Sequence, residues 1–414
     1  MSCDDYDGVI DAASGTIPFV KYTSCGNNFV IVDATQSSPL EEEDWSEFAG
    51  KATSTSFGIG CDNLLVVQKA SPQTLSTIWR SRHYWSDLPS LPSADYVFRM
   101  FEPNGDEAAC CGNGLICVAD YLRQKYGVTS TSIVTEIPMS HPNTVAIGSN
   151  GAAGSWVNLG TPRKMPAKLI SADNLQPVTD AIDMINELNI SFRATDFQDY
   201  IPDGRLSFRA YLVFTGEPHM VVFPDLDFSR PGLADLVFGS TVNGASPQDS
   251  RRGIGSALVH RIGYFINKRC KHLFPEGISV NFARINHLGK VENRCFERGI
   301  NRETHACCTG ALAVAIVAQN LFGLKFTSIE LIPKRCTEEA DASIKILETS
   351  SGWCLTTNPF FLFEGRYSTP PFSIKRQSDN DTYMDDNVEY STMQELTLSH
   401  PGVTYYSRRP AQKV

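Results

Sequence analysis

Two long apolar segments of the chain open with the same short pattern, and each opening contains a cysteine. The first runs from Cys111 as CGNGLICVADYLRQKYG and the second from Cys307 as CCTGALAVAIVAQNLFG. Both are typical of helices, and each closes on a glycine suited to a C-cap. The second is apolar on nearly every side, which predicts a helix through the middle of a domain. The shared C-x-x-G register indicates a weak internal repeat and two similar halves that face each other.

The remaining segments of the chain favour strands. Turn residues alternate with short runs rich in Val, Ile and Phe, a pattern that predicts strands and hairpins in both halves. The clearest examples are Thr16 to Asp33, Gly58 to Gln68, Tyr96 to Phe101 and Leu212 to Phe223.

Length and charge limit the function. A chain of 414 residues, 42% hydrophobic and 20% charged, can bury a large core and is long enough for two domains. The formal net charge of −10 argues against a nucleic acid or an anionic membrane as partner, because both need a basic surface. A small molecule is the expected partner.

The sequence also indicates where the protein is located and whether its cysteines form disulfides. No run reaches the ~18 apolar residues of a spanning helix, and Met1 to Ile10 is acidic where a secretory signal would be basic, so we expect a cytoplasmic protein. The twelve cysteines are then thiols rather than a disulfide framework. No pair of C-x-x-C ligands is present, so we expect no zinc site and no metal.

Two thiols at helix starts suit the inversion of a carbon next to a carboxylate. Inversion removes a proton from one face and delivers another to the opposite face, and an unperturbed thiol has a pKa of ~8.5, near working pH. The free N–H groups of a helix start also bind anions. Small residues at both openings leave room for a substrate carboxylate: Gly112, Asn113 and Gly114 on one side, and Cys308, Thr309 and Gly310 on the other. The competing interpretation, cysteine as a small buried hydrophobe, suffices for Cys3, Cys270, Cys336 and Cys354.

At this point the sequence resembles the diaminopimelate epimerase family. The similarity covers about residues 17–366 in nine ordered blocks. They are KYTSCGNNFVIVD from Lys21, GIGCDNLLVV from Gly58, FEPNGDE from Phe101, CGNG from Cys111, GEPHMVVF from Gly216, VNF from Val280, ERG from Glu297, ETHACCTG from Glu303 and TNPFFLFEG from Thr357.

The resemblance implies an α/β (α+β) fold of two pseudo-symmetric domains, each a curved mixed sheet or barrel around a central helix. We expect an N-terminal domain at 17–165 after an extension at 1–16, and a C-terminal domain at 166–350. A strand at 351–366 then returns to the first domain, and a polar tail fills 367–414. Residues 70–94 and 225–252 read as insertions; the first is either part of a lid over the substrate or surface packing. A homodimer is a further expectation.

The resemblance also implies catalysis without a cofactor, pyridoxal phosphate included, by Cys111 and Cys307 as two bases. His219 and Glu297 would tune the thiols and orient the substrate. From the residues alone, that histidine would more often be structural and Glu297-Arg298 a solvated pair. The substrate-binding residues implied by the family pattern, by its altered positions and by the helix openings are Asn27, Asn63, Glu102, Gly112, Asn113, Glu217, Ser279, Asn281, Arg298, Cys308 and Thr309.

The sequence departs from the family at the far end of the substrate. Glu102, Glu217 and Ser279 stand where the family has asparagines that serve the second carboxylate of diaminopimelate, and Asn63 replaces a glutamine. New carboxylates would repel that group. We therefore expect a basic amino acid such as arginine, lysine, ornithine or histidine, unless both glutamates face solvent.

Two alternatives stay open at this point. The first is an authentic diaminopimelate epimerase in which Arg298 alone holds the second carboxylate. The second belongs to another class: a non-catalytic binding protein or a thiol–disulfide protein, because two facing cysteines can oxidise.

Overall fold

The computed structural model describes residues 16–90, 94–171, 176–179, 182–193, 203–230, 232–239, 254–286, 290–322, 328–337, 339–368 and 403–406. The predicted extension lies outside these residues up to position 15, as do most of the tail and 240–252 of the second insertion.

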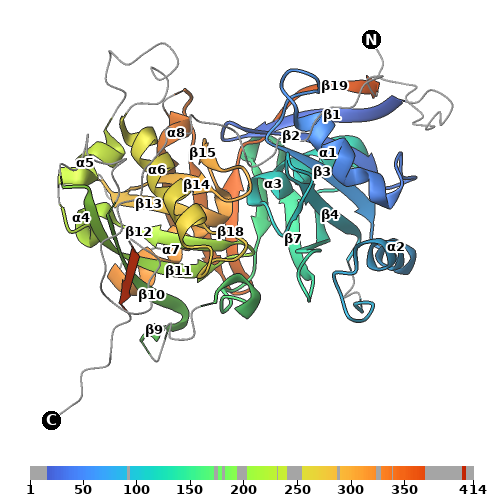
Figure 1. The fold of residues 1–414 in the computed structure, drawn as a ribbon. Coiled ribbons are helices and arrows are strands. Elements are labelled where there is room, and N and C mark those ends of the chain that lie inside the picture. Colours follow the sequence, from blue (N-terminus) through green and yellow to red (C-terminus); the bar gives the residue numbers. More distant parts are fainter. Residues whose placement is uncertain are drawn as a thin grey trace.

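Strands dominate both halves of the molecule, and two helices lie inside them (Figure 1). The strands of the first half are β1 (Thr16–Ser24), β2 (Asn27–Ala34), β3 (Asn63–Lys69), β4 (Tyr96–Phe101), β5 (Glu107–Ala108), β6 (Ser130–Thr135), β7 (Asn143–Ser149) and β8 (Ser155–Asn158). Those that follow are β9 (Gln176–Thr179), β10 (Ile182–Arg193), β11 (Arg205–Phe214), β12 (Pro218–Val222), β13 (Ser279–Ile285), β14 (Val291–Glu297), β15 (Arg302–Thr304), β16 (Ser328–Pro333), β17 (Ile344–Thr349), β18 (Gly352–Thr357), β19 (Phe360–Ser368) and β20 (Val403–Tyr406). The helices are α1 (Trp45–Thr53), α2 (Pro72–Arg82), α3 (Gly112–Tyr126), α4 (Pro224–Asp227), α5 (Gly232–Phe238), α6 (Ile254–Arg269), α7 (Cys308–Phe322) and α8 (Lys334–Thr337), with short 3-10 turns η1 (Glu42–Asp44), η2 (Gly151–Ala153) and η3 (Ala167–Leu169).

The two halves repeat one order of strand pairings. In the first, β2 pairs parallel with β3, β3 antiparallel with β4, β4 parallel with β6, and β6 antiparallel with β7. In the second, β12, β13, β14, β16 and β17 repeat that sequence of parallel and antiparallel pairs. The predicted α3 follows β5 in one half, and the predicted α7 follows β15 in the other. The internal repeat suggested by the two cysteine openings is therefore a repeat of whole topology.

Two strand pairings connect the halves. β18 pairs with β8, and β19 runs antiparallel to β1 along the top of the first half (Figure 1). α3 and α7 share one hydrophobic cluster, which spans both halves. As the composition of α7 predicted, its residues from Cys308 to Ala318 are all buried.

The predicted helix ends are also found in α3. Cys111 is its N-cap, and Gly127 ends the helix in the left-handed conformation that glycine adopts without strain (φ 68°). The equivalent glycine after α7 lies outside the described residues.

The insertion at 70–94 holds α2, which packs on the first half. Arg82 forms an ion pair with Glu42 on η1, and the Trp85 indole donates to the carbonyls of Ile137 and Met139. Among the described residues of 70–94, none lines the cavity considered below. Surface packing, rather than a lid, is what these contacts indicate.

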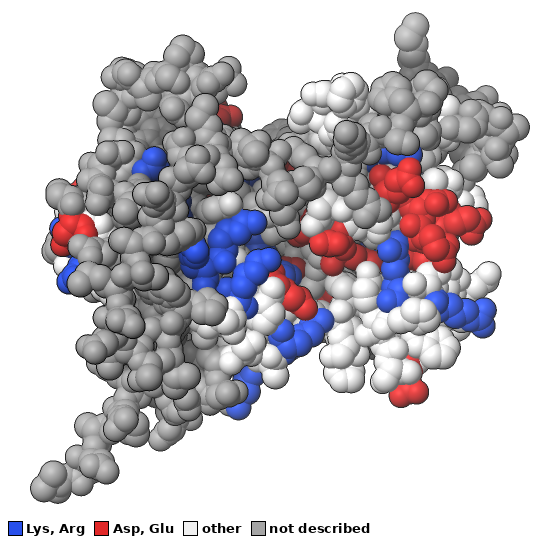
Figure 2. All heavy atoms as spheres, in the orientation of Figure 1, with Lys and Arg blue, Asp and Glu red and all other residues white. Residues whose placement is uncertain are grey.

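Acidic and basic side chains both lie on the surface of the molecule. On the face in Figure 2, acidic groups gather over the half that holds α1 and α2, and basic groups lie nearer the middle. In the described residues, no helix is long and apolar enough to cross a membrane.

Candidate active site

The starts of α3 and α7 meet at one point between the two halves. The Asn113 side chain donates to the carbonyl oxygen of Ala306 (2.9 Å), and the Cys308 thiol donates to Asn113 Oδ1 (2.6 Å). A Cβ atom on Gly112 would lie 2.6 Å from the Cβ of Cys308, so only glycine permits this approach. The helix starts, with the anion-binding N–H groups of each, therefore face a common space.

A cavity at this point collects nearly all the residues predicted from the sequence. Every predicted catalytic or substrate-binding residue except Asn281 lines this cavity. They are Asn27, Asn63, Glu102, Cys111, Gly112, Asn113, Glu217, His219, Ser279, Glu297, Arg298, Cys307, Cys308 and Thr309. Met100, Ala108, Cys110 and Ile300 also line it. Met100, Ala108 and Ile300 belong to no pattern that sequence reasoning could single out, whereas Cys110 forms a doublet with Cys111.

The two thiols occupy equivalent positions. Cys111 Sγ accepts the backbone N–H of Gly114 (3.3 Å), and Cys307 Sγ accepts that of Gly310 (3.4 Å). The glycines of the shared C-x-x-G pattern have a steric reason, since a Cβ on Gly310 would lie 2.2 Å from Asn281 Oδ1, and one on Gly114 would lie 3.2 Å from the Leu65 and Phe98 side chains. Burial, reinforced by the nearby Glu297 carboxyl, raises the pKa of Cys111 well above its usual range.

A directed chain of hydrogen bonds ends at the second thiol. Asn281 Nδ2 donates to His219 Nδ1 (3.1 Å), so the proton of the neutral ring sits on Nε2, which donates to Thr309 Oγ1 (3.0 Å). The Thr309 hydroxyl is then free to donate to Cys307 Sγ (3.4 Å). Burial, with a smaller effect of Arg298, lowers the pKa of His219 to about 3, so this histidine is neutral. Asn281 thus contacts His219 and does not line the cavity.

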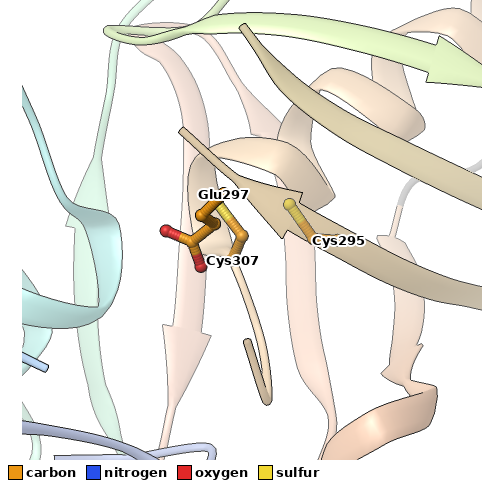
Figure 3. Close-up of side chains that lie close together, drawn as sticks. All are labelled: Cys295, Glu297 and Cys307. Carbon is orange, nitrogen blue, oxygen red and sulfur yellow. The ribbon is translucent and has the colours of Figure 1, made fainter. Parts of the chain in front are cut away.

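Glu297 lies beside Cys307 at the end of β14 (Figure 3). Its Oε1 accepts the hydroxyl of Thr304, and burial raises its pKa to about 7 despite that hydrogen bond. The carboxyl can therefore gain or lose a proton near neutral pH.

The acidic substitutions do not face open solvent. Arg298 binds Glu217 Oε2 through Nε (2.8 Å) and Nη2 (2.5 Å), and Glu217 Oε1 accepts the backbone N–H groups of Ala109 (2.9 Å) and Cys110 (3.1 Å). The sequence-based expectation that Arg298 and Glu217 would each bind substrate did not include this ion pair. In this ion pair, Arg298 uses two of its N–H groups on Glu217, and Glu217 uses one of its carboxylate oxygens on Arg298.

Glu102 differs from Glu217 because burial and neighbouring charges, rather than a hydrogen bond found in the described part of the chain, are the main influences on its carboxyl. It packs against Gly299, and burial raises its pKa to about 8, with Arg298 lowering it and Glu217 raising it. Asn63 Nδ2 is likewise buried without a hydrogen-bond partner among the described residues. Both groups line the cavity, one as an acceptor and one as a donor.

Comparisons with known proteins agree with this architecture. A family model described as diaminopimelate epimerase matches residues 19–164. The chain is 28% identical over 333 residues to the diaminopimelate epimerase of Archaeoglobus fulgidus, covering 77% of this chain and 86% of that protein. It is 26% identical over 321 residues to the diaminopimelate epimerase of Acinetobacter baumannii, covering 76% and 86%.

A solved structure supports the fold itself. The probable proline racemase from Agrobacterium radiobacter K84, with bound carbonate, aligns with a TM-score of 0.52 at 13% identity, covering 86% of this chain and 94% of that one. The α/β fold expected from the sequence is therefore confirmed. The family model and the two relatives show that the chain is similar to diaminopimelate epimerases over about three quarters of its length, and they support an isomerase.

Proposed function

We propose that the chain inverts the α-carbon of an amino acid with a cationic far end, using Cys111 and Cys307 as its two proton-transferring groups. One observation carries the reaction type: two thiols in equivalent N-cap positions, on helices whose starts touch, line one cavity. Each half contributes one thiol, as an inversion requires.

The surroundings of the thiols support an unequal pair. The backbone N–H of Gly310 and the Thr309 hydroxyl both point at Cys307 Sγ, and such donors stabilise a thiolate. Cys111 is held as a thiol, because burial and the Glu297 carboxyl disfavour its charge. In one direction Cys307 would remove the α-proton while Cys111 delivers a proton to the opposite face. In the reverse direction their roles exchange.

The helix starts supply the remaining chemistry. The α-carboxylate would lie against their N–H groups, which also stabilise the charge that develops when the α-proton leaves. Asn63 Nδ2, buried without a partner among the described residues, is a ready donor to the same substrate.

Charge at the far end supports a cationic substrate. Glu217 already satisfies the Arg298 guanidinium, so Arg298 has little capacity left for a second substrate carboxylate. Glu102 is a carboxyl without a hydrogen-bond partner in the described residues, and a substrate cation would remove the cost of ionising it. A far-end carboxylate would instead make the ionisation of Glu102 still more costly.

Diaminopimelate itself is the second candidate. The relatives named above are diaminopimelate epimerases, and Arg298 does line the cavity. For that substrate, Arg298 would have to exchange Glu217 for the distal carboxylate, which leaves a buried Glu217 without its cation.

An inversion assay over a substrate panel separates the two. We expect kcat/KM for L-arginine, L-lysine or L-ornithine to exceed that for LL-diaminopimelate at least about tenfold. Glu102→Asn, which restores the family residue, should lower the ratio of these two kcat/KM values about tenfold, as expected for the loss of one charge-assisted contact. Asp106→Asn, which removes an exposed acid nearby that does not line the cavity, is the matched control and should not lower the ratio. Diaminopimelate turnover above every basic amino acid would refute the substrate assignment.

A further inference from the structure

A third cysteine lies next to the Cys307 thiol, outside the cavity lining. Cys295 sits two residues before Glu297 on β14, so both side chains leave the same face of the strand. Their donor atoms and Cys307 Sγ all lie within 4.8 Å of one another (Figure 3). Cys295 and Cys307 are buried, and Glu297 is partly buried on the cavity side.

The geometry points to a Zn²⁺ site made by Cys295, Glu297 and Cys307, whose occupancy withdraws Cys307 from catalysis. Two sulfurs and one carboxylate oxygen match the ligands zinc prefers, and three protein ligands leave a fourth position open to water. With Zn–S bonds of ~2.3 Å, two sulfurs on a tetrahedral zinc lie roughly 3.8 Å apart, so the cluster needs to contract only modestly.

The neighbouring contacts fit such an ion. The Thr304 hydroxyl holds one oxygen of Glu297, which fixes the carboxyl and leaves the other oxygen for the metal. Glu297 and Cys307 line the cavity, so an ion can reach them along the route of the substrate. Binding would release the two thiol protons to solvent and leave two thiolates that together offset the ionic charge.

The inhibitory effect depends on the proposed function, whereas binding of the ion does not. With Cys307 as a zinc ligand, its sulfur lone pair is committed to the metal and cannot take the α-proton. The two statements therefore need separate readouts.

Binding is measured first, by competition between the full chain and a chromophoric chelator for Zn²⁺ in a phosphine reductant. We expect one Zn²⁺ per chain, with affinity weakened at least about a hundredfold in Cys295→Ser, since loss of even an indirect partner of a metal ligand costs 10–100-fold. Cys295→Ala repeats the test if the serine variant does not fold, and Cys354→Ser on β18 is the matched control. No zinc binding, or binding unaffected by both Cys295 variants, would overturn the site.

Inhibition is then measured as the ratio of inversion rates without and with Zn²⁺ within each variant. The unmodified chain should lose at least about nine-tenths of its activity at saturation and recover it with EDTA, while Cys295→Ser at the same zinc concentration keeps its own rate. Tight binding through Cys295 with undiminished inversion would contradict the assignment of Cys307 as a base and leave the metal site standing.

Discussion

At the scale of single residues, Glu102 should make substrate binding depend on pH. The carboxyl has a pKa of about 8, set by burial and by Arg298, Glu217, Asp106 and Glu297 around it. A cationic substrate binds the ionised form, so KM should fall as pH rises towards about 8, by up to tenfold per unit at the acidic end. Glu102→Gln should flatten this part of the profile, and Asp106→Asn should not. Identical profiles for the unmodified chain and Glu102→Gln would exclude the contact.

The same carboxyl affects stability with a definite sign. Because its folded pKa lies above the ordinary value of 4.5, the folded chain holds the proton where the unfolded chain has lost it. This contribution destabilises the fold progressively as pH rises from about 4.5 to about 8. Thermal unfolding of Glu102→Gln should show a smaller fall over that window.

The sequence could flag individual residues but not their partners. Glu102 and Glu217 stood out as departures from a family pattern, yet the Glu217–Arg298 pair joins positions 81 residues apart and depends on tertiary structure alone. Cys295 was missed because a cysteine on a strand next to Phe296 is ordinarily a core residue. Its importance comes only from its distance to Cys307.

At the scale of elements, the contact between α3 and α7 is the feature that positions both thiols. Gly112→Ala would place a methyl group 2.6 Å from the Cβ of Cys308, which cannot rotate away. We expect a loss of about 1–3 kcal/mol in the free energy of unfolding, together with reduced activity, because the helix starts must separate.

A second substitution in the same contact should restore the stability that Gly112→Ala removes. Cys308→Gly removes the clashing atom. The Gly112→Ala/Cys308→Gly double variant should therefore recover most of the stability lost on Gly112→Ala, with Cys308→Gly alone as reference. Gly232→Ala on α5, where a Cβ meets nothing within 4 Å, is the matched neutral control. Denaturant unfolding measures all four; strictly additive losses would show that the helix starts do not touch.

Helices were predictable in proportion to how strongly their pattern stands out. α3 and α7 were found because an apolar run, a capping residue and a glycine end agree. α6 was missed because it contains Gly255 and Gly263, and helical propensity disfavours glycine. Its Gly263 is needed for packing, since a Cβ there would lie 2.2 Å from the Phe296 ring.

At the scale of the whole molecule, the site exists because two halves with one topology face each other. The pairings of β8 with β18 and of β1 with β19 hold the halves in register, and each half brings one helix start to the cavity. The C-x-x-G repeat in the sequence predicted two similar halves that face each other. The strand order could not be predicted from the sequence, because parallel pairs such as β12 with β13 join segments separated by a long excursion through α4, α5 and α6. The cytoplasmic location and the homodimer remain predictions.

If two thiols act on opposite faces of one carbon, the α-hydrogen of the substrate is exchanged with solvent as the carbon inverts. One enantiomer of the best substrate is incubated with the reduced enzyme in D₂O, and the reaction is stopped early. The two enantiomers are then separated, and the deuterium content of each is measured by mass spectrometry. We expect deuterium in the inverted product and hydrogen in the recovered substrate. Inversion should be abolished in Cys111→Ala and in Cys307→Ala but not in Cys354→Ala. An inverted product that keeps the hydrogen of its substrate, or inversion that survives both changes, would contradict inversion by two thiols.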